Sequence, residues 1–126
     1  MTDVVIVHAQ EDRARAQALA AALSMLDIAV AWDGEAAAAA AVIALWSQDS
    51  VACEAVRAAA RDASSRETLV SVQIDECRLP FELRLIHTEY LGVGAEDSGD
   101  PVWHRVLERI GELVGRPGLG LLENQT

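Results

Sequence analysis

The fold of this chain is set by Asp3-Val4-Val5-Ile6-Val7-His8-Ala9-Gln10-Glu11-Asp12-Arg13. Four consecutive apolar residues, Val4 to Val7, are typical of a strand that is covered on both faces, as in the centre of a parallel sheet. A short polar and acidic segment follows, and it leads directly into a segment rich in alanine and leucine. Open α/β sheets bind their ligands in the loops after such strands. We therefore expect a parallel sheet organised around this first strand.

The amino-acid composition excludes several classes of function for this chain. The length of 126 residues is that of a single domain. The 20 acidic residues exceed the 10 basic residues, and the resulting charge of −10 argues against binding to nucleic acids or to anionic membrane surfaces. Every basic residue is an arginine. The absence of lysine excludes a Walker-type phosphate loop, a Schiff-base lysine and a lysine-assisted phospho-acceptor site.

The cysteines and histidines predict neither disulfides nor a metal site. Cys53 and Cys77 occur in a chain with no N-terminal signal pattern and no apolar run near the ~20 residues of a membrane span. We therefore expect a cytoplasmic protein with two free thiols. Neither cysteine belongs to a Cys-x-x-Cys pair, and His8, His87 and His104 have no ligand spacing, so no metal is expected.

Strand and helix patterns alternate along the rest of the chain. Residues 101–114 carry the strongest helix pattern, with Asp100 as cap, Pro101 at the first position and a stripe of large apolar residues. The other predicted elements are a helix from Asp12 to about Leu26, a strand at 28–32, a strand at 42–46, a helix from Ser50 to about Ser64, a strand at 69–74, a short helix from Pro80 to Leu85 and a strand at 89–93.

This alternation predicts a flavodoxin-like, doubly wound α/β domain. Right-handed crossovers favour a five-stranded parallel sheet in the order 2-1-3-4-5. The second helix is truncated, because only Gly34 to Ala41 connect the second strand to the third. We assign residues 1–115 to the domain. Residues 116–126, with two glycines, are expected to form a flexible tail or linker.

Five segments within residues 3–114 resemble bacterial Toll/interleukin-1 receptor (TIR) domains in order and spacing. They are Val5-Ile6-Val7-His8-Ala9 with Glu11-Asp12-Arg13, Val30-Ala31-Trp32-Asp33, Val42-Ile43-Ala44-Leu45-Trp46-Ser47, Leu69-Val70-Ser71-Val72 and Leu79-Pro80-Phe81. The resemblance implies self-association in bacterial signalling or defence. It also implies cleavage of NAD at the nicotinamide–ribose bond, an activity of many members of the family.

The same resemblance implies that the catalytic site is degenerate here. NAD-cleaving members carry a glutamate on the helix after strand three, where it stabilises the developing oxocarbenium charge. Laying that motif over this chain places Ala59 at the glutamate position and Ala55 at a tryptophan position. The long connection that covers the nucleotide is reduced to Gly34–Ala41. We expect a non-catalytic module without a cofactor; the alternative is an NAD-cleaving or nucleotide-binding enzyme with Glu54 as its carboxylate.

If a ligand cleft exists, it lies where the first and third strands end. Its candidate residues are His8, Gln10, Glu11, Asp12, Trp46, Ser47 and Ser50. Several of them also have a structural interpretation. His8 can cap a neighbouring backbone group, and Trp46 can belong to the core. The carboxylates of the acidic pair that follows His8 are favoured at a helix N-terminus. Cys53, in the first turn of its helix, is either a reactive thiol or a small buried residue.

The second strand is a candidate interaction surface. It lies at an edge of the predicted sheet, and its bulky residues Ile28, Val30 and Trp32 share one face. No lysine, arginine or proline protects this strand from pairing with another chain. The expected partner is a second copy of the protein or another TIR-like protein.

Overall fold

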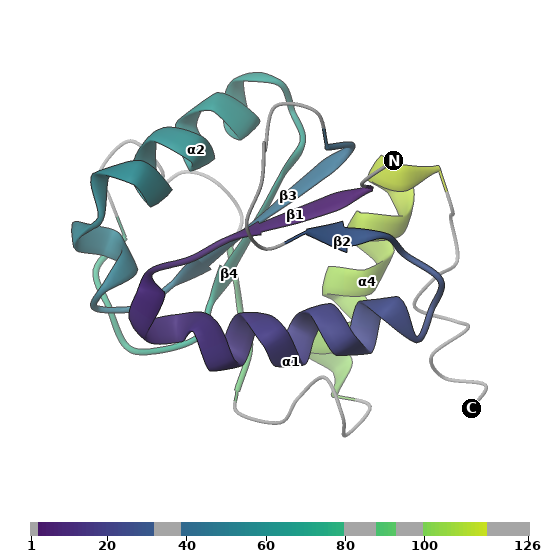
Figure 1. The fold of residues 1–126 in the computed structure, drawn as a ribbon, viewed down its shortest axis with the longest axis horizontal. Helices are drawn as coiled ribbons and strands as arrows, with labels where there is room; N and C mark the ends of the chain where they lie inside the picture. The colour runs from purple at the N-terminus through teal and green to yellow at the C-terminus, as the bar shows by residue number, and fades with distance from the viewer. Residues whose placement is uncertain (1–2, 32–38, 80–87, 93–99, 116–126) are drawn as a thin grey trace.

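The computed structural model describes residues 3–31, 39–79, 88–92 and 100–115 (Figure 1). Its centre is a parallel five-stranded sheet in the order β2-β1-β3-β4-β5, which confirms the predicted flavodoxin-like topology. The strands are β1 (Val4–Val7), β2 (Val30–Ala31), β3 (Ala41–Trp46), β4 (Leu69–Gln73) and β5 (Thr88–Tyr90).

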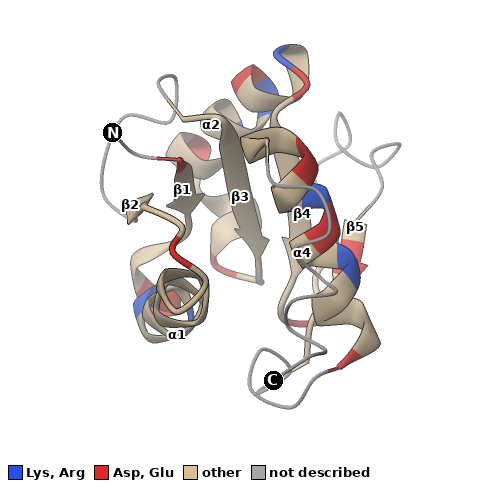
Figure 2. Ribbon diagram, turned by 90° about the vertical axis from the view of Figure 1, so that its right-hand side faces the viewer, with Lys and Arg blue, Asp and Glu red and all other residues tan. Residues whose placement is uncertain are grey.

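Helices cover both faces of this sheet. The described α-helices are α1 (Arg13–Ser24), α2 (Glu54–Ser65) and α4 (Pro101–Val114), and the short 3-10 turns η1 (Gln10–Asp12) and η3 (Ser50–Ala52) follow β1 and β3. Residues of α1 and α4 share one hydrophobic cluster with the sheet, and residues of α2 belong to a second cluster. On their common face, α1 contacts β2 while α4 contacts β3, β4 and β5 (Figure 2).

The central strand β3 divides the core into these two clusters. All six of its residues are buried. Alternate side chains of a strand point to opposite faces, so Ile43 and Leu45 pack with α1 and α4, whereas Ala44 and Trp46 pack with α2. A continuous apolar run is therefore needed here, because neither face of the strand meets water.

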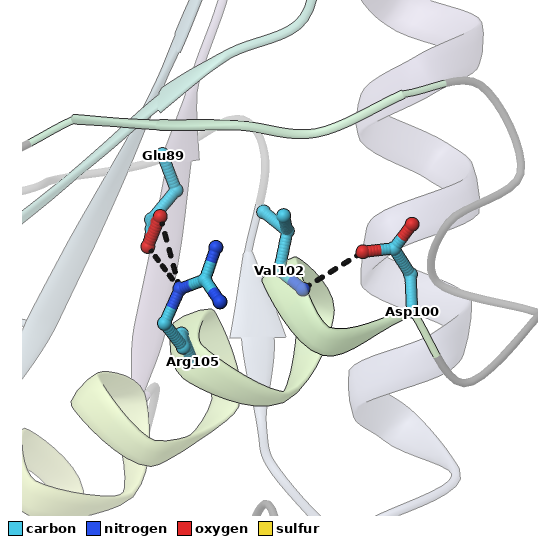
Figure 3. Close-up of polar contacts among 4 residues, drawn as sticks. All are labelled: Glu89, Asp100, Val102 and Arg105. Carbon is cyan, nitrogen blue, oxygen red and sulfur yellow. Dashed lines mark hydrogen bonds and ion pairs between the residues drawn. The ribbon is translucent and has the colours of Figure 1, made fainter.

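The last helix forms as its sequence predicts. The Asp100 carboxylate accepts a hydrogen bond from the Val102 backbone N–H at 2.8 Å (Figure 3), and Pro101 occupies the first turn. Gly115, with a φ of 80°, ends the helix in the left-handed conformation that glycine tolerates. The buried stripe of α4 consists of Trp103, Val106, Leu107, Ile110 and Gly111.

The edge strand β2 begins later than expected. Among the described residues, Val30 and Ala31 pair with β1, whereas Ile28 and Ala29 precede the strand. Ile28 is buried at the end of α1, where its N–H donates to the Leu23 carbonyl, so it contributes to the core and not to an uncovered edge. The turn at Asp27, with a φ of 61°, directs the chain inward at this point. Trp32 lies outside the described residues.

The helix expected from Ser50 is interrupted. Residues 50–52 form η3, Cys53 adopts an extended conformation with φ −91° and ψ 113°, and α2 begins only at Glu54. The 3-10 turn ends with the Cys53 N–H donating to the Ser50 carbonyl. Cys53 therefore precedes the helix as its N-cap residue and does not belong to its first turn.

Three expectations fall largely or wholly outside the described residues. These are the truncated second helix between Gly34 and Ala41, the short helix from Pro80 to Leu85, and the tail at 116–126. Only the end of the first segment is described, and there Ala41 already belongs to β3.

Candidate functional site at the carboxyl ends of the strands

A cleft of about 390 Å³ lies beyond the carboxyl ends of β1 and β3. These strands are neighbours in the sheet. From β1 the chain continues to β2 at one edge, and from β3 it continues to β4 on the other side. Open α/β folds bind their ligands at such a change of direction. The described lining comes from the segments after β1 and β3 and consists of Ala9, Gln10, Glu11, Gln48, Asp49, Ala52 and Cys53. Of the seven predicted cleft residues, only Gln10 and Glu11 are among them.

Three of the other predicted residues form a structural network beneath the cleft. The Ser47 hydroxyl donates to the Asp12 carboxylate, which joins the turn after β3 to the turn after β1. The Ser47 backbone N–H donates to the Ser50 hydroxyl at 2.7 Å, and the Ser50 N–H donates back to the Ser47 hydroxyl at 3.2 Å. Both serines are buried. Their polar atoms therefore bind each other and Asp12.

Trp46 does not line the cleft, which corrects its inclusion among the ligand residues. Its side chain is completely buried on the α2 face of β3. The indole N–H donates to the Ser71 hydroxyl on β4 at 2.9 Å, and the Thr88 hydroxyl bonds to the same Ser71 oxygen at 2.8 Å. The core interpretation of Trp46 is correct, because its position on β3 places it on the same face as Val42 and Ala44.

His8 and Glu54, the remaining candidates from the sequence, lie outside the described cleft lining. His8 is half-buried, and its Nδ1 lies 2.7 Å from the carbonyl oxygen of Ala9, to which it donates. Glu54 is exposed on α2 and forms an ion pair with Arg61 at 2.7 Å and a longer one with Arg57 at 3.9 Å. Its carboxylate therefore already has cationic partners on the helix surface.

The two cysteines are free thiols in half-buried positions. Cys53 lines the cleft. Burial raises the pKa of the Cys77 thiol, and the nearby carboxylates of Asp75 and Asp12 raise it further. Cys77 thus favours its protonated, less nucleophilic form.

The cleft is acidic. Glu11 and Asp49 contribute carboxylates, and the described lining includes no arginine. Across the described ranges, no group of three or more His, Cys, Asp or Glu side chains could hold a metal ion. None of the described helices combines the length and apolar character that crossing a membrane requires.

A larger cavity, of about 540 Å³, lies elsewhere, near the amino end of β4 and beside α4. Sequence reasoning missed it, because its residues come from β4, β5 and α4 and are far apart in the chain. The only local signal was the pair Arg105 and Arg109, one turn apart on the solvent side of the last helix.

The fold and the cleft define a small flavodoxin-like α/β protein. Comparison of the chain with protein-family models, curated proteins and solved structures finds no match.

Proposed function

We propose that this protein is a non-catalytic, TIR-like interaction module that associates with itself or with another TIR-like protein in bacterial signalling or defence. The observation that carries this proposal is the bonding of Asp12, Ser47 and Ser50 to one another beneath the cleft. Polar groups that could hold a nucleotide at this position instead stabilise the loops. The cytoplasm is the expected compartment for such a module.

The charge of the cleft supports the same conclusion. A dinucleotide brings a pyrophosphate, which proteins bind with backbone N–H groups, helix N-termini or cationic side chains. Here the Glu11 and Asp49 carboxylates line the space. Like charges at close range repel, and the repulsion is stronger near a protein surface than in bulk water. On the helix that follows, the motif position of the catalytic acid is held by Ala59.

Self-association is assigned to the β2 edge. Strand β2 pairs with β1 through the partners Val4↔Val30 and Val5↔Ala31, and among the described strands it is the last on its side of the sheet. Val30 and Ala31 are only half-buried. An edge strand offers backbone hydrogen-bonding groups to a strand from another chain.

The alternative function is that of an NAD-cleaving or nucleotide-binding enzyme. The position of the cleft at the switch between β1 and β3 favours it, as does the placement of Glu54 directly after Cys53, a residue that lines the cleft. For catalysis, the Glu54 carboxylate would have to break its ion pair with Arg61.

Nicotinamide release from NAD by the full chain tests the non-catalytic assignment. We expect no release above that of a protein-free control. Turnover that Glu54→Ala abolishes, while the matched exposed variant Glu112→Ala retains it, would overturn the proposal in favour of the enzyme. Turnover retained in both variants would also overturn it and would place the catalytic acid elsewhere.

A further inference from the structure

The cavity beside α4 has the size and the mixed lining of a small-molecule site. Its volume of about 540 Å³ falls within the roughly 300–1,000 Å³ of ligand pockets. It lies near the amino end of β4, away from the carboxyl-end cleft. The described lining consists of Leu69, Val70, Ser71, Glu89, Arg105, Val106, Glu108, Arg109 and Glu112.

One part of the cavity is apolar and rigid. Val70 near the start of β4 and Val106 in the buried stripe of α4 belong to the same hydrophobic cluster, whereas the Leu69 side chain belongs to the cluster on the α2 face. Val70 and Val106 are buried, with exposed fractions of 5% and 2%. Their position is fixed by the sheet and by the packing of α4, so they offer a preformed surface to an apolar group.

Arginine side chains form the charged part. Arg105 directs its Nε to both carboxylate oxygens of Glu89, at 2.7 and 3.2 Å, and this contact orients the guanidinium group (Figure 3). In the described part of the chain, the two terminal nitrogens of Arg105 have no hydrogen-bond partner. Arg109, one turn later, makes a single loose contact with Glu112 at 3.5 Å. Both arginines can therefore donate further hydrogen bonds to a carboxylate.

Acidic side chains stand beside these arginines, and Figure 2 shows both charge types along α4. In the described lining, the carboxylates of Glu89, Glu108 and Glu112 against two guanidinium groups leave a net charge of −1. A simple anion would add to this negative charge, and a simple cation would face both arginines. A zwitterion adds no net charge and can satisfy both signs at once.

We propose that this cavity binds a small zwitterion with an apolar side chain, of the free α-amino acid class. The ligand carboxylate bonds to the terminal nitrogens of Arg105 and to Arg109. Its ammonium group lies against Glu108, and its side chain contacts Val70 and Val106. The proposal is independent of the carboxyl-end cleft and of the self-association assigned to β2.

Titration of the full chain with leucine, followed by ¹H–¹⁵N NMR, tests this site. We expect saturable shifts of backbone resonances in α4 and at the start of β4, with a dissociation constant in the millimolar range. Glycine, which lacks the apolar group, should bind at least about tenfold more weakly. N-acetyl-leucine and leucinamide each lack one of the two charges, and they should be similarly weakened.

Arg109→Gln should reduce leucine affinity by about tenfold, because it removes one charged donor at an exposed position. The matched control is Arg61→Gln on α2, which leaves the cavity unchanged. The proposal is overturned if leucine causes no saturable shifts, or if N-acetyl-leucine binds as tightly as leucine. Equal weakening in both arginine variants would also overturn it.

Discussion

The hydroxyl of Ser47, directly after β3, donates a hydrogen bond to the carboxylate of Asp12, directly after β1. This contact joins the two loops that border the carboxyl-end cleft. Ser47 is buried and Asp12 is half-buried, so water cannot readily replace the bond. The pair therefore stabilises the site and is not free to bind a ligand there.

Ser47→Ala should lower the free energy of unfolding by about 1.5–3 kcal/mol, the range for hydrogen bonds to charged groups. Denaturant unfolding measures the loss. The exposed neighbour Glu11 supplies the control, since Glu11→Ala should stay within about 0.5 kcal/mol of wild type. In the double variant Asp12→Ala/Ser47→Ala, the two losses should be less than additive. Full additivity would show that the contact is absent in solution.

The first strand and the last helix could be predicted because they depend on local signals, and the strand order because right-handed crossovers favour it for alternating strands and helices. A buried strand is predicted by the apolar run at Val4–Val7, and the start of a helix is predicted by Asp100-Pro101. The structure contains both elements. The site could be predicted only in part. Strand alternation shows that Trp46 shares a face with Ala44 but does not say which helix covers that face.

The same limit explains the errors around α2 and β2. Ser50 is a good helix cap by residue type, yet its hydroxyl accepts from Ser47, and the chain continues as a 3-10 turn. Ile28 alternates correctly with Val30, but the left-handed turn at Asp27 directs it into the core. Both outcomes depend on contacts between neighbouring segments, and the spacing of apolar residues does not predict such contacts.

Leu107→Ala should destabilise the protein by about 2–5 kcal/mol, because Leu107 is completely buried between α4 and the sheet. That loss is a large part of the stability of a small domain. Thermal unfolding provides the measurement, with the exposed neighbouring substitution Glu108→Ala as control. Similar melting temperatures for the two variants would show that α4 does not pack as described.

Ser71→Ala should cost about 1–3 kcal/mol, because it leaves the buried indole N–H of Trp46 without its acceptor. Chemical unfolding gives the magnitude. Ser71→Thr retains a hydroxyl and should recover part of the loss. If Ser71→Ala is as stable as wild type, the indole N–H has another partner.

Cys77 should react with iodoacetamide more slowly at neutral pH than a small free thiol does. Burial first, and then Asp75 and Asp12, raise its pKa, so the thiolate forms only at higher pH. The Cys53→Ser background isolates the reaction of Cys77. Asp75→Asn removes one negative neighbour and should shift the pH profile back toward lower pH. A profile at or below that of the free thiol would contradict the assigned environment.

Self-association through the β2 edge is tested most directly by sedimentation velocity over a range of protein concentrations. Ala29 is exposed beside β2, so Ala29→Lys adds a charge at the edge without burying it. The matched control is Ala58→Lys, at an exposed position on α2. We expect the wild type and Ala58→Lys to form a concentration-dependent dimer, and Ala29→Lys to remain a folded monomer. A wild type that is monomeric at every concentration, or a dimer that Ala29→Lys leaves intact, would contradict this expectation.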